Sequence, residues 1–210
     1  MEIPLNARVE CTDGVYGRLI CVLINPVAKQ LTRLVVKEDA FPNEAYMVSI
    51  EFVTETIVDT IRLNCNKAKL ETMDPFIKTT YIESKVPWVT SAYRGGAYTM
   101  GYYTSNITSE ILEVENQQIP LGELAVRRNT RVEATDGYIG HVDEFVINPE
   151  NGHITQLVMR EGHLWGKKDV IIPLPAMSEM GESSRDTLLL KLNKHQVETL
   201  PNIPLHRLWS

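Results

Sequence analysis

The chain has 210 residues, of which 43% are hydrophobic and 23% charged, a composition that excludes a disordered polar tract and a membrane protein. The formal net charge is −6 without any block of like charge, which argues against direct contact with nucleic acid. Because the three cysteines have neither zinc nor disulfide spacing, and no secretion signal or spanning segment is evident, we expect a soluble cytoplasmic protein.

The strongest pattern in the sequence is an internal repeat. Residues 8–38 match residues 131–161 without a gap at an offset of 123, and 14 of these 31 positions are identical. The match resumes at an offset of 127, where Asp59-Thr60 corresponds to Asp186-Thr187. A repeat of this kind indicates two copies of one domain. We therefore assign residues 1–76 to domain 1, residues 77–118 to a linker, and residues 119–210 to domain 2 with a C-terminal tail.

Both copies contain turn-forming residues at equivalent positions, before or between runs of apolar residues. An Asp-Gly pair between two such runs is a strong hairpin signal, because both residues tolerate a positive φ. The motif D-G-x-x-G precedes a strand and not a helix, so we interpret it as a turn and not as a phosphate-binding loop. These structural turn residues are Asp13, Gly14 and Gly17, then Asp136, Gly137 and Gly140, and finally Asn148, Pro149 and Gly152.

The linker holds the least ordinary composition of the chain. Residues 76–125 contain seven of the 15 aromatic residues, and glycines interrupt them, so no continuous regular element is expected through Tyr93–Tyr103. Downstream, Ser109–Gln117 predicts a short helix. Aromatic residues with arginine are enriched at protein contacts, and the alternative is that the rings fold back over the two domains. The predicted partner-contact residues are Trp88, Tyr93, Arg94, Tyr98, Tyr102, Tyr103 and, near the C-terminus, Trp209.

The second copy predicts short strands followed by one helix. The expected strands are Arg131–Thr135, His141–Ile147, His153–Glu161, Asp169–Leu174 and Thr187–Leu192. Asn193 is placed to cap a helix over Asn193–Leu200. Five to six short antiparallel strands with tight turns indicate a small barrel, because closure leaves no exposed edge.

The tail after this helix is extended and apolar. Pro201 and Pro204 exclude a helix there, and the segment corresponds to Met73–Ile77 at the end of the first copy. Two alternatives remain: the tail packs on its own domain, or Trp209 anchors on another subunit. The correspondence with Met73–Ile77 favours the structural role.

The second copy resembles the PRC-barrel family. The residues that carry the resemblance are Val132, Asp136-Gly137, Gly140, Asn148-Pro149, Gly152, Ile154-Thr155, Leu157-Val158 and Ile172-Pro173. The first copy departs from the pattern at Lys29, which stands in place of Gly152, and at Ser49, which stands in place of Pro173. The resemblance implies a mainly β fold of two PRC-type barrels and a role in non-catalytic protein contact, because family members include a reaction-centre subunit and a ribosome-maturation factor.

Candidate chemistry in the second copy is weak. His141, His153 and His163, with Asp143 and Glu144 nearby, are of the types that hold zinc or manganese. Their spacing fits no ligand pattern, so we favour solvated or turn-capping histidines. Alternation predicts the two carboxylates on opposite faces of a strand, a poor arrangement for acid–base catalysis. No nucleophile–base motif is found, so we predict no catalytic residue, no metal and no cofactor.

Three functions follow, of which the first is favoured. It is a non-enzymatic scaffold or adaptor that presents the aromatic linker to another protein. The alternatives are a ribosome- or RNA-processing-associated factor acting through a protein contact, and a ligand- or metal-responsive sensor. Because domains this small bury little surface alone, we expect the copies to pack against each other or against a second chain in a homo-oligomer.

Overall fold

The computed structural model describes residues 1–87, 107–161, 169–178 and 187–200. The chain is mainly β, with two short helices among these residues. It divides into two compact units, one of Met1–Phe76 with Gln118–Ser210 and one of Ile77–Gln117. No helix in the described part of the chain has the length and apolar character needed to cross a membrane.

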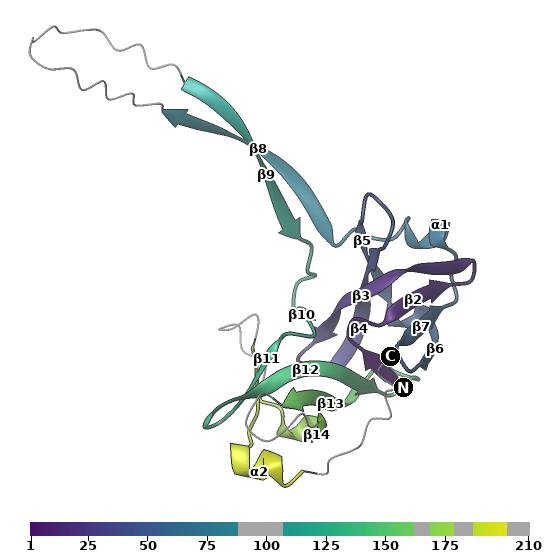
Figure 1. Ribbon diagram of the computed structural model, residues 1–210, viewed down its shortest axis with the longest axis vertical. Coiled ribbons are helices and arrows are strands. Elements are labelled where there is room, and N and C mark those ends of the chain that lie inside the picture. The colour runs from purple at the N-terminus through teal and green to yellow at the C-terminus, as the bar shows by residue number, and fades with distance from the viewer. Residues whose placement is uncertain (88–106, 162–168, 179–186, 201–210) are drawn as a thin grey trace, which may run out of the picture. The chain divides into compact units, whose positions relative to one another are not determined.

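Each copy of the repeat forms one sheet and ends in a short helix (Figure 1). The first copy contains β2 (Arg8–Cys11), β3 (Gly14–Asn25), β4 (Gln30–Glu38), β5 (Ala45–Ser49), β6 (Val53–Ile57), β7 (Thr60–Leu63) and α1 (Lys67–Leu70), with a 3-10 turn η1 (Ile50–Phe52). The second contains β11 (Arg131–Ala134), β12 (Gly137–Ile147), β13 (Ile154–Glu161), β14 (Asp169–Pro173), β15 (Thr187–Leu189) and α2 (Lys194–Glu198), with η2 (Leu174–Ala176).

Apart from β6, the two sheets have the same strand order, and they also have the same irregularities of register. The order is β5-β4-β3-β2-β7-β6 in the first and β14-β13-β12-β11-β15 in the second. The register of β3 against β4 shifts between Leu19 and Cys21, and that of β12 against β13 shifts between Val142 and Glu144. Both shifts are β-bulges at the same repeat position, which places Ile20 and Asp143 as equivalent extra residues. The repeat seen in the sequence is therefore a repeat of structure.

The expectation of closed antiparallel barrels is wrong in two respects. The pair β2–β7 is parallel, with Arg8 opposite Thr60, and so is β11–β15, with Arg131 opposite Thr187. Among the described residues the sheets also do not close on themselves, because the strand order ends at β5 and β6 in one and at β14 and β15 in the other. Alternation in a sequence marks a strand but carries no information on the direction of a distant neighbour.

The two copies exchange strands. Strand β1 (Glu2–Pro4), which precedes the first copy, pairs with β12 of the second, with Ile3 opposite Phe145. Strand β10 (Leu124–Val126), which precedes the second copy, pairs with β3 of the first, with Val126 opposite Val22. At the repeat offset of 123, Ile3 corresponds to Val126 and Phe145 to Val22, so the two pairings are equivalent. Each copy therefore receives the strand that precedes the other. Figure 1 shows β1 beside β12 and β10 beside β3.

An approximate twofold axis relates the copies. Leu31 N–H donates to the Gly152 carbonyl at 3.0 Å, and Ile154 N–H donates to the Lys29 carbonyl at 3.0 Å. Between them Gln30 forms a bridge with His153, its own counterpart in the repeat. Residues that meet their own equivalents mark a symmetric, self-complementary interface, as in a twofold dimer.

One hydrophobic core spans both copies. It includes Ile3, Leu19, Leu31, Phe145 and Leu157, all of which are fully buried. The expectation that the two copies pack together is thereby confirmed. A shared core lets two small sheets bury more apolar surface than either would alone.

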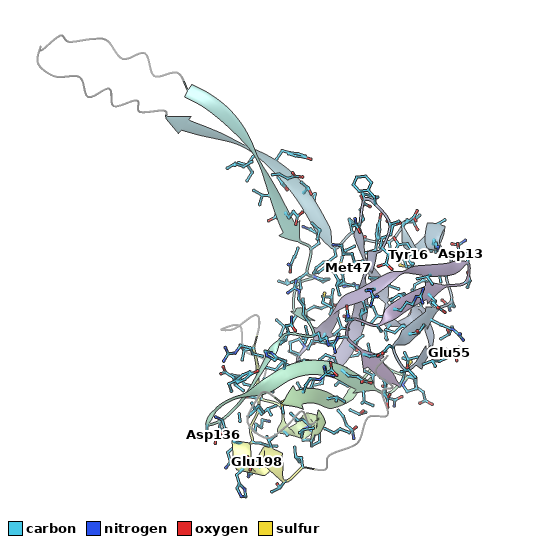
Figure 2. The ribbon with its side chains drawn as sticks, in the orientation of Figure 1. Asp13, Tyr16, Met47, Glu55, Asp136 and Glu198 are labelled. Carbon is cyan, nitrogen blue, oxygen red and sulfur yellow. The ribbon has the colours of Figure 1, made fainter. Side chains whose placement is uncertain are left out.

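The Asp-Gly turns hold the helices in place. Asp13 Oδ1 accepts the Lys67 N–H at 3.0 Å, and Asp136 Oδ1 accepts the Lys194 N–H at 2.9 Å. Figure 2 shows Asp13 beside α1 and Asp136 at the equivalent turn near α2. Asn193 caps α2 as expected, through a reciprocal capping box with Gln196. Each turn aspartate therefore supplies an acceptor to a helix some 54 or 58 residues further along the chain.

The unit Ile77–Gln117 contains a long antiparallel hairpin. Strands β8 (Ile77–Pro87) and β9 (Ile107–Gln117) pair in register over their whole length, from Ile77 opposite Gln117 to Pro87 opposite Ile107. The helix predicted over Ser109–Gln117 is wrong, because this segment is a strand. Leu112, Glu113, Val114 and Glu115 alternate apolar and acidic residues, the period of a strand with one polar face.

Candidate protein-interaction surface

The residues predicted to contact a partner lie outside the described residues. This holds for Trp88, Tyr93, Arg94, Tyr98, Tyr102 and Tyr103 in the linker and for Trp209 in the tail. The structure does describe both ends of the linker, since Pro87 and Ile107 face each other at the ends of β8 and β9. The aromatic segment is thus bracketed in sequence by two paired strands.

The hairpin has two chemically different faces. Side chains alternate along each strand, so Thr80, Ile82, Leu112 and Val114 share one face, with Ile82 opposite Leu112 and Thr80 opposite Val114. We call these four residues the apolar hairpin face. On the other face Thr79 lies opposite Glu115 and Tyr81 opposite Glu113.

The apolar hairpin face is largely exposed. The side chain of Ile82 is 50% exposed and that of Leu112 48%, although the two are direct cross-strand neighbours. A two-stranded hairpin is marginally stable by itself in water, and cross-strand apolar pairs contribute only about 0.2–1 kcal/mol each. Contact of this face with another protein would both bury the pair and stabilise the hairpin.

The predicted turn residues have structural roles. Gly14 and Gly137 both have a φ of 121°, and Gly152 has a φ of 68°. A Cβ at Gly17 would lie 1.9 Å from the Lys37 carbonyl oxygen, so only glycine lets β3 approach β4 there. Asn148 Oδ1 accepts the Glu150 N–H at 2.9 Å, which shapes the Asn-Pro turn. Within the residues described, these positions serve the backbone.

The three histidines are separated by the fold. Tyr138 Oη lies 2.8 Å from His141 Nε2, and the Asn129 carbonyl lies 3.2 Å from His141 Nδ1, so both ring nitrogens have partners. His153 lies at the bridge with Gln30, and His163 lies outside the described residues. Within the ranges that the structure covers, no three His, Cys, Asp or Glu side chains are grouped so that they could hold a metal ion.

A buried ion-pair cluster was missed by the sequence analysis. Asp143 is 2% exposed and accepts from Arg128 Nε at 2.9 Å and from Arg160 Nη2 at 3.1 Å. The bulge between Val142 and Glu144 breaks the alternation on which the opposite-face prediction for Asp143 and Glu144 depended, and both carboxylates are buried. A two-residue carboxylate pattern gives no signal for a bulge.

The cysteines are buried thiols held in the protonated form. Burial raises the pKa of Cys11 to about 12, and burial likewise raises the pKa of Cys21 to about 12. Because the thiolate is the reactive form, neither side chain is suited to nucleophilic chemistry near neutral pH.

Comparison with known proteins identifies one domain. The PRC-barrel domain family matches residues 128–195, which comprise β11 to the start of α2. This match indicates a protein-interaction module in the second copy. No curated protein shows significant similarity to the chain.

Proposed function

We propose that this chain is a non-enzymatic scaffold or adaptor in which two PRC-type copies carry a partner-binding hairpin. The observation that supports it best is the apolar hairpin face, where Ile82 and Leu112 are opposite each other and about half exposed. The PRC-barrel match supports the scaffold role, and the reciprocal strand exchange supports the assignment of the first copy to the same fold.

The hairpin is the proposed recognition element for two physical reasons. Its two strands bracket the aromatic segment that contains Trp88 and Tyr93–Tyr103, the composition typical of interface anchors. Its apolar hairpin face also presents two apolar side chains, Ile82 and Leu112, that are paired across the strands and about half exposed. Burying such a surface is the main favourable term in protein association.

The remaining groups support a non-catalytic role. The buried thiols are protonated, the turn residues serve the backbone, and the ring nitrogens of His141 are engaged. Asp143 forms ion pairs with two arginines, as expected of a structural carboxylate.

The test compares two variants that place the same charge pair on opposite faces of the hairpin. Ile82→Lys with Leu112→Glu replaces the apolar pair by a cross-strand Lys–Glu pair, and Thr79→Lys creates the same pair with Glu115 on the other face. Recovery of a discrete partner from a native lysate is expected to fall at least about tenfold with the first variant, because a buried apolar contact is lost.

The matched control, Thr79→Lys, should keep recovery within about twofold, since single surface changes have small effects. Circular dichroism of both variants checks that the fold persists. Equal recovery with both variants, or no discrete partner with the native chain, would overturn the proposal for the hairpin.

A further inference from the structure

Two of the three cysteines meet at the place where the first sheet continues into α1. Cys11 ends β2, and Cys65 lies between β7 and α1. Thr12 N–H donates to the Cys65 carbonyl at 3.0 Å, so the two cysteines stand on neighbouring segments of backbone. The Cys11 thiol also forms a hydrogen bond with the Cys65 thiol. The fold brings together two residues that are far apart in the chain, so their spacing in the sequence does not predict the pair.

The backbone geometry is suited to a disulfide. Strands β2 and β7 are parallel neighbours up to Glu10, which lies opposite Arg62, and the bond between Thr12 and Cys65 extends this contact beyond the strands. Neighbouring strands lie about 4.7–4.9 Å apart. A disulfide requires Cα atoms about 4.4–6.8 Å apart and side chains that are directed toward each other. The hydrogen bond between the two thiols meets the second condition.

The second copy has the same backbone contact without the thiols. Thr135 N–H donates to the Leu192 carbonyl at 2.9 Å, which is the equivalent bond in the second copy. Ala134 stands at the position of Cys11, and Leu192 stands at that of Cys65. The fold therefore accepts apolar side chains at both positions, and packing alone does not account for two adjacent thiols in the first copy.

The third cysteine lies apart from this pair. It belongs to a separate apolar cluster on the other face of the first sheet, which we call the outer cluster and which consists of Cys21, Leu23, Val35, Ala45, Met47, Phe76 and Ala125. Cys11 and Cys65 belong to the core shared by the two copies. Cys21 has no exposed surface, whereas Cys11 is 7% and Cys65 5% exposed. Cys21 is therefore an internal control for a reaction of the pair.

We propose that Cys11 and Cys65 form a disulfide that fastens the segment preceding α1 to β2. The oxidant is a low-molecular-weight disulfide such as glutathione disulfide. The thiolate of one cysteine attacks it, which forms a mixed disulfide and releases one glutathione. The thiolate of the other cysteine then attacks the mixed disulfide, which forms the bond between Cys11 and Cys65 and releases the second glutathione. Two thiols of the chain are oxidised, one external disulfide is reduced, and the two protons pass to the released glutathione.

The exchange starts in the unfolded chain. Burial raises the pKa of the Cys11 thiol to about 12 in the folded chain, and burial also raises the pKa of Cys65. The thiolate is the attacking species, and an unperturbed cysteine has a pKa of about 8.5. Both thiols therefore react faster before folding. Because thiol–disulfide exchange is reversible, the folded backbone then selects the pair that stays linked.

Refolding of the full chain in a glutathione redox buffer tests the pairing. The reduced, unfolded chain is refolded with reduced and oxidised glutathione, its free thiols are trapped with N-ethylmaleimide under denaturing conditions, and peptide mass mapping locates the label. We expect the label on Cys21 alone. The link between Cys11 and Cys65 should be at least about tenfold more abundant than any other pairing, which corresponds to about 1.4 kcal/mol.

Two matched variants separate the pair from the third cysteine. Cys11→Ala introduces the side chain that the second copy has at this position, and it should leave both remaining cysteines labelled. Cys21→Ala should keep the link between Cys11 and Cys65 and carry no label. Each variant removes one buried thiol, so a general effect of losing a cysteine would appear in both.

Amide hydrogen exchange gives a second measurement on the native chain. The oxidised and reduced forms are compared at Thr12, whose amide donates to Cys65, and at Thr135, whose equivalent bond has no thiols beside it. Oxidation should slow exchange at Thr12 at least about tenfold more than at Thr135, because the link opposes local opening of the segment before α1. Reduction with excess dithiothreitol should restore the original ratio.

Four results of the mapping would overturn the proposal. They are label on all three cysteines, glutathione retained on Cys11 or Cys65, a link that involves Cys21, and a disulfide between two chains. Equal slowing of exchange at Thr12 and Thr135 would also contradict a bond that fastens this segment. The disulfide does not depend on the partner-binding hairpin, so its failure and that of the proposed function are distinguishable.

Discussion

The two copies share one inner face and differ in their outer faces. Toward the common core, Leu31 and Leu34 correspond to Ile154 and Leu157, and all four side chains are at most 2% exposed. On the outer side, the bulge residue is Ile20 in the first copy and Asp143 in the second, and the next residue is Cys21 in the first and Glu144 in the second. The same backbone therefore carries an apolar cluster on one outer face and an ionic cluster on the other.

This contrast separates what the fold requires from what it merely permits. The bulges, the exchanged strands and the Asp-Gly turns recur in both copies, as expected of backbone features on which the shared core depends. Outer-face residues need only be covered or paired, so an aromatic ring in one copy and two arginines in the other both suffice. Specialisation of the second copy is therefore expected on its outer face.

The largest expected effect concerns an inner position where the side chains of the two copies differ strongly in size. Phe145 is fully buried opposite Ile3, and its counterpart Val22 is fully buried opposite Val126. Phe145→Ala should lower the free energy of unfolding by about 3–5 kcal/mol, because a large cavity forms in the shared core. Urea unfolding measures it, and Val22→Ala should cost less. A cost below that of Val22→Ala would show that the two copies do not share one tightly packed core.

The next effect tests the ionic cluster. Asp143→Ala leaves Arg128 and Arg160 without this carboxylate and should cost about 1.5–3 kcal/mol, the range for a charged hydrogen bond. Both arginine side chains are about a third exposed, which limits the penalty. The equivalent change Ile20→Ala should cost less, because Ile20 is only partly buried against the outer cluster. Equal costs in urea unfolding would mean that the ion pairs add nothing beyond packing.

Much of the fold could be predicted because the repeat is written in local patterns. The strands β12 and β13, the cap at Asn193 and the Asp-Gly turns follow from alternation and turn chemistry within a few residues. The parallel pairs β2–β7 and β11–β15 and the exchange of β1 could not be predicted in this way, since they join residues about 50 or 140 positions apart. The alternation of polar and apolar residues locates the strands, whereas the pairing of strands that are distant in sequence depends on the packing of the whole core.

The candidate site divides in the same manner. The composition of the linker, residues 77–118, predicted a partner-binding segment but not its two strands, Ile77–Pro87 and Ile107–Gln117. The prediction relied on the aromatic and glycine residues at the centre of the linker and did not use the alternation of polar and apolar residues in the strands on either side. The cluster at Asp143 was missed because a bulge redirects side chains without any sequence mark.

A pH experiment sharpens the contrast between Cys21 and its counterpart Glu144. Burial raises the pKa of Cys21 from 9.0 to about 12, so between these values the unfolded chain releases the proton and the folded chain keeps it. The associated stability is complete below pH 9 and is lost as pH rises toward 12. The free energy of unfolding should therefore fall by about 1.4 kcal/mol more per pH unit in the native chain than in Cys21→Ala. Parallel pH dependence of the two chains in urea unfolding would contradict a buried, protonated thiol.

The smallest effect concerns a feature in which the copies should not differ. Asp13 and Asp136 accept a helix N–H at 3.0 and 2.9 Å, so Asp13→Ala and Asp136→Ala should each cost about 1 kcal/mol, as expected for loss of a capping acceptor. Asp→Asn at either position keeps a side-chain oxygen and should cost less. Thermal or urea unfolding of the four variants gives the comparison. The two turns are also alike in that Gly14 lies near the Lys67 side chain and Gly137 near the Lys194 side chain. A loss of stability on substitution of only one of the two aspartates would mean that only that helix is held by its turn. Equal costs would place this contact among the features that the shared fold requires, together with the bulges and the exchanged strands.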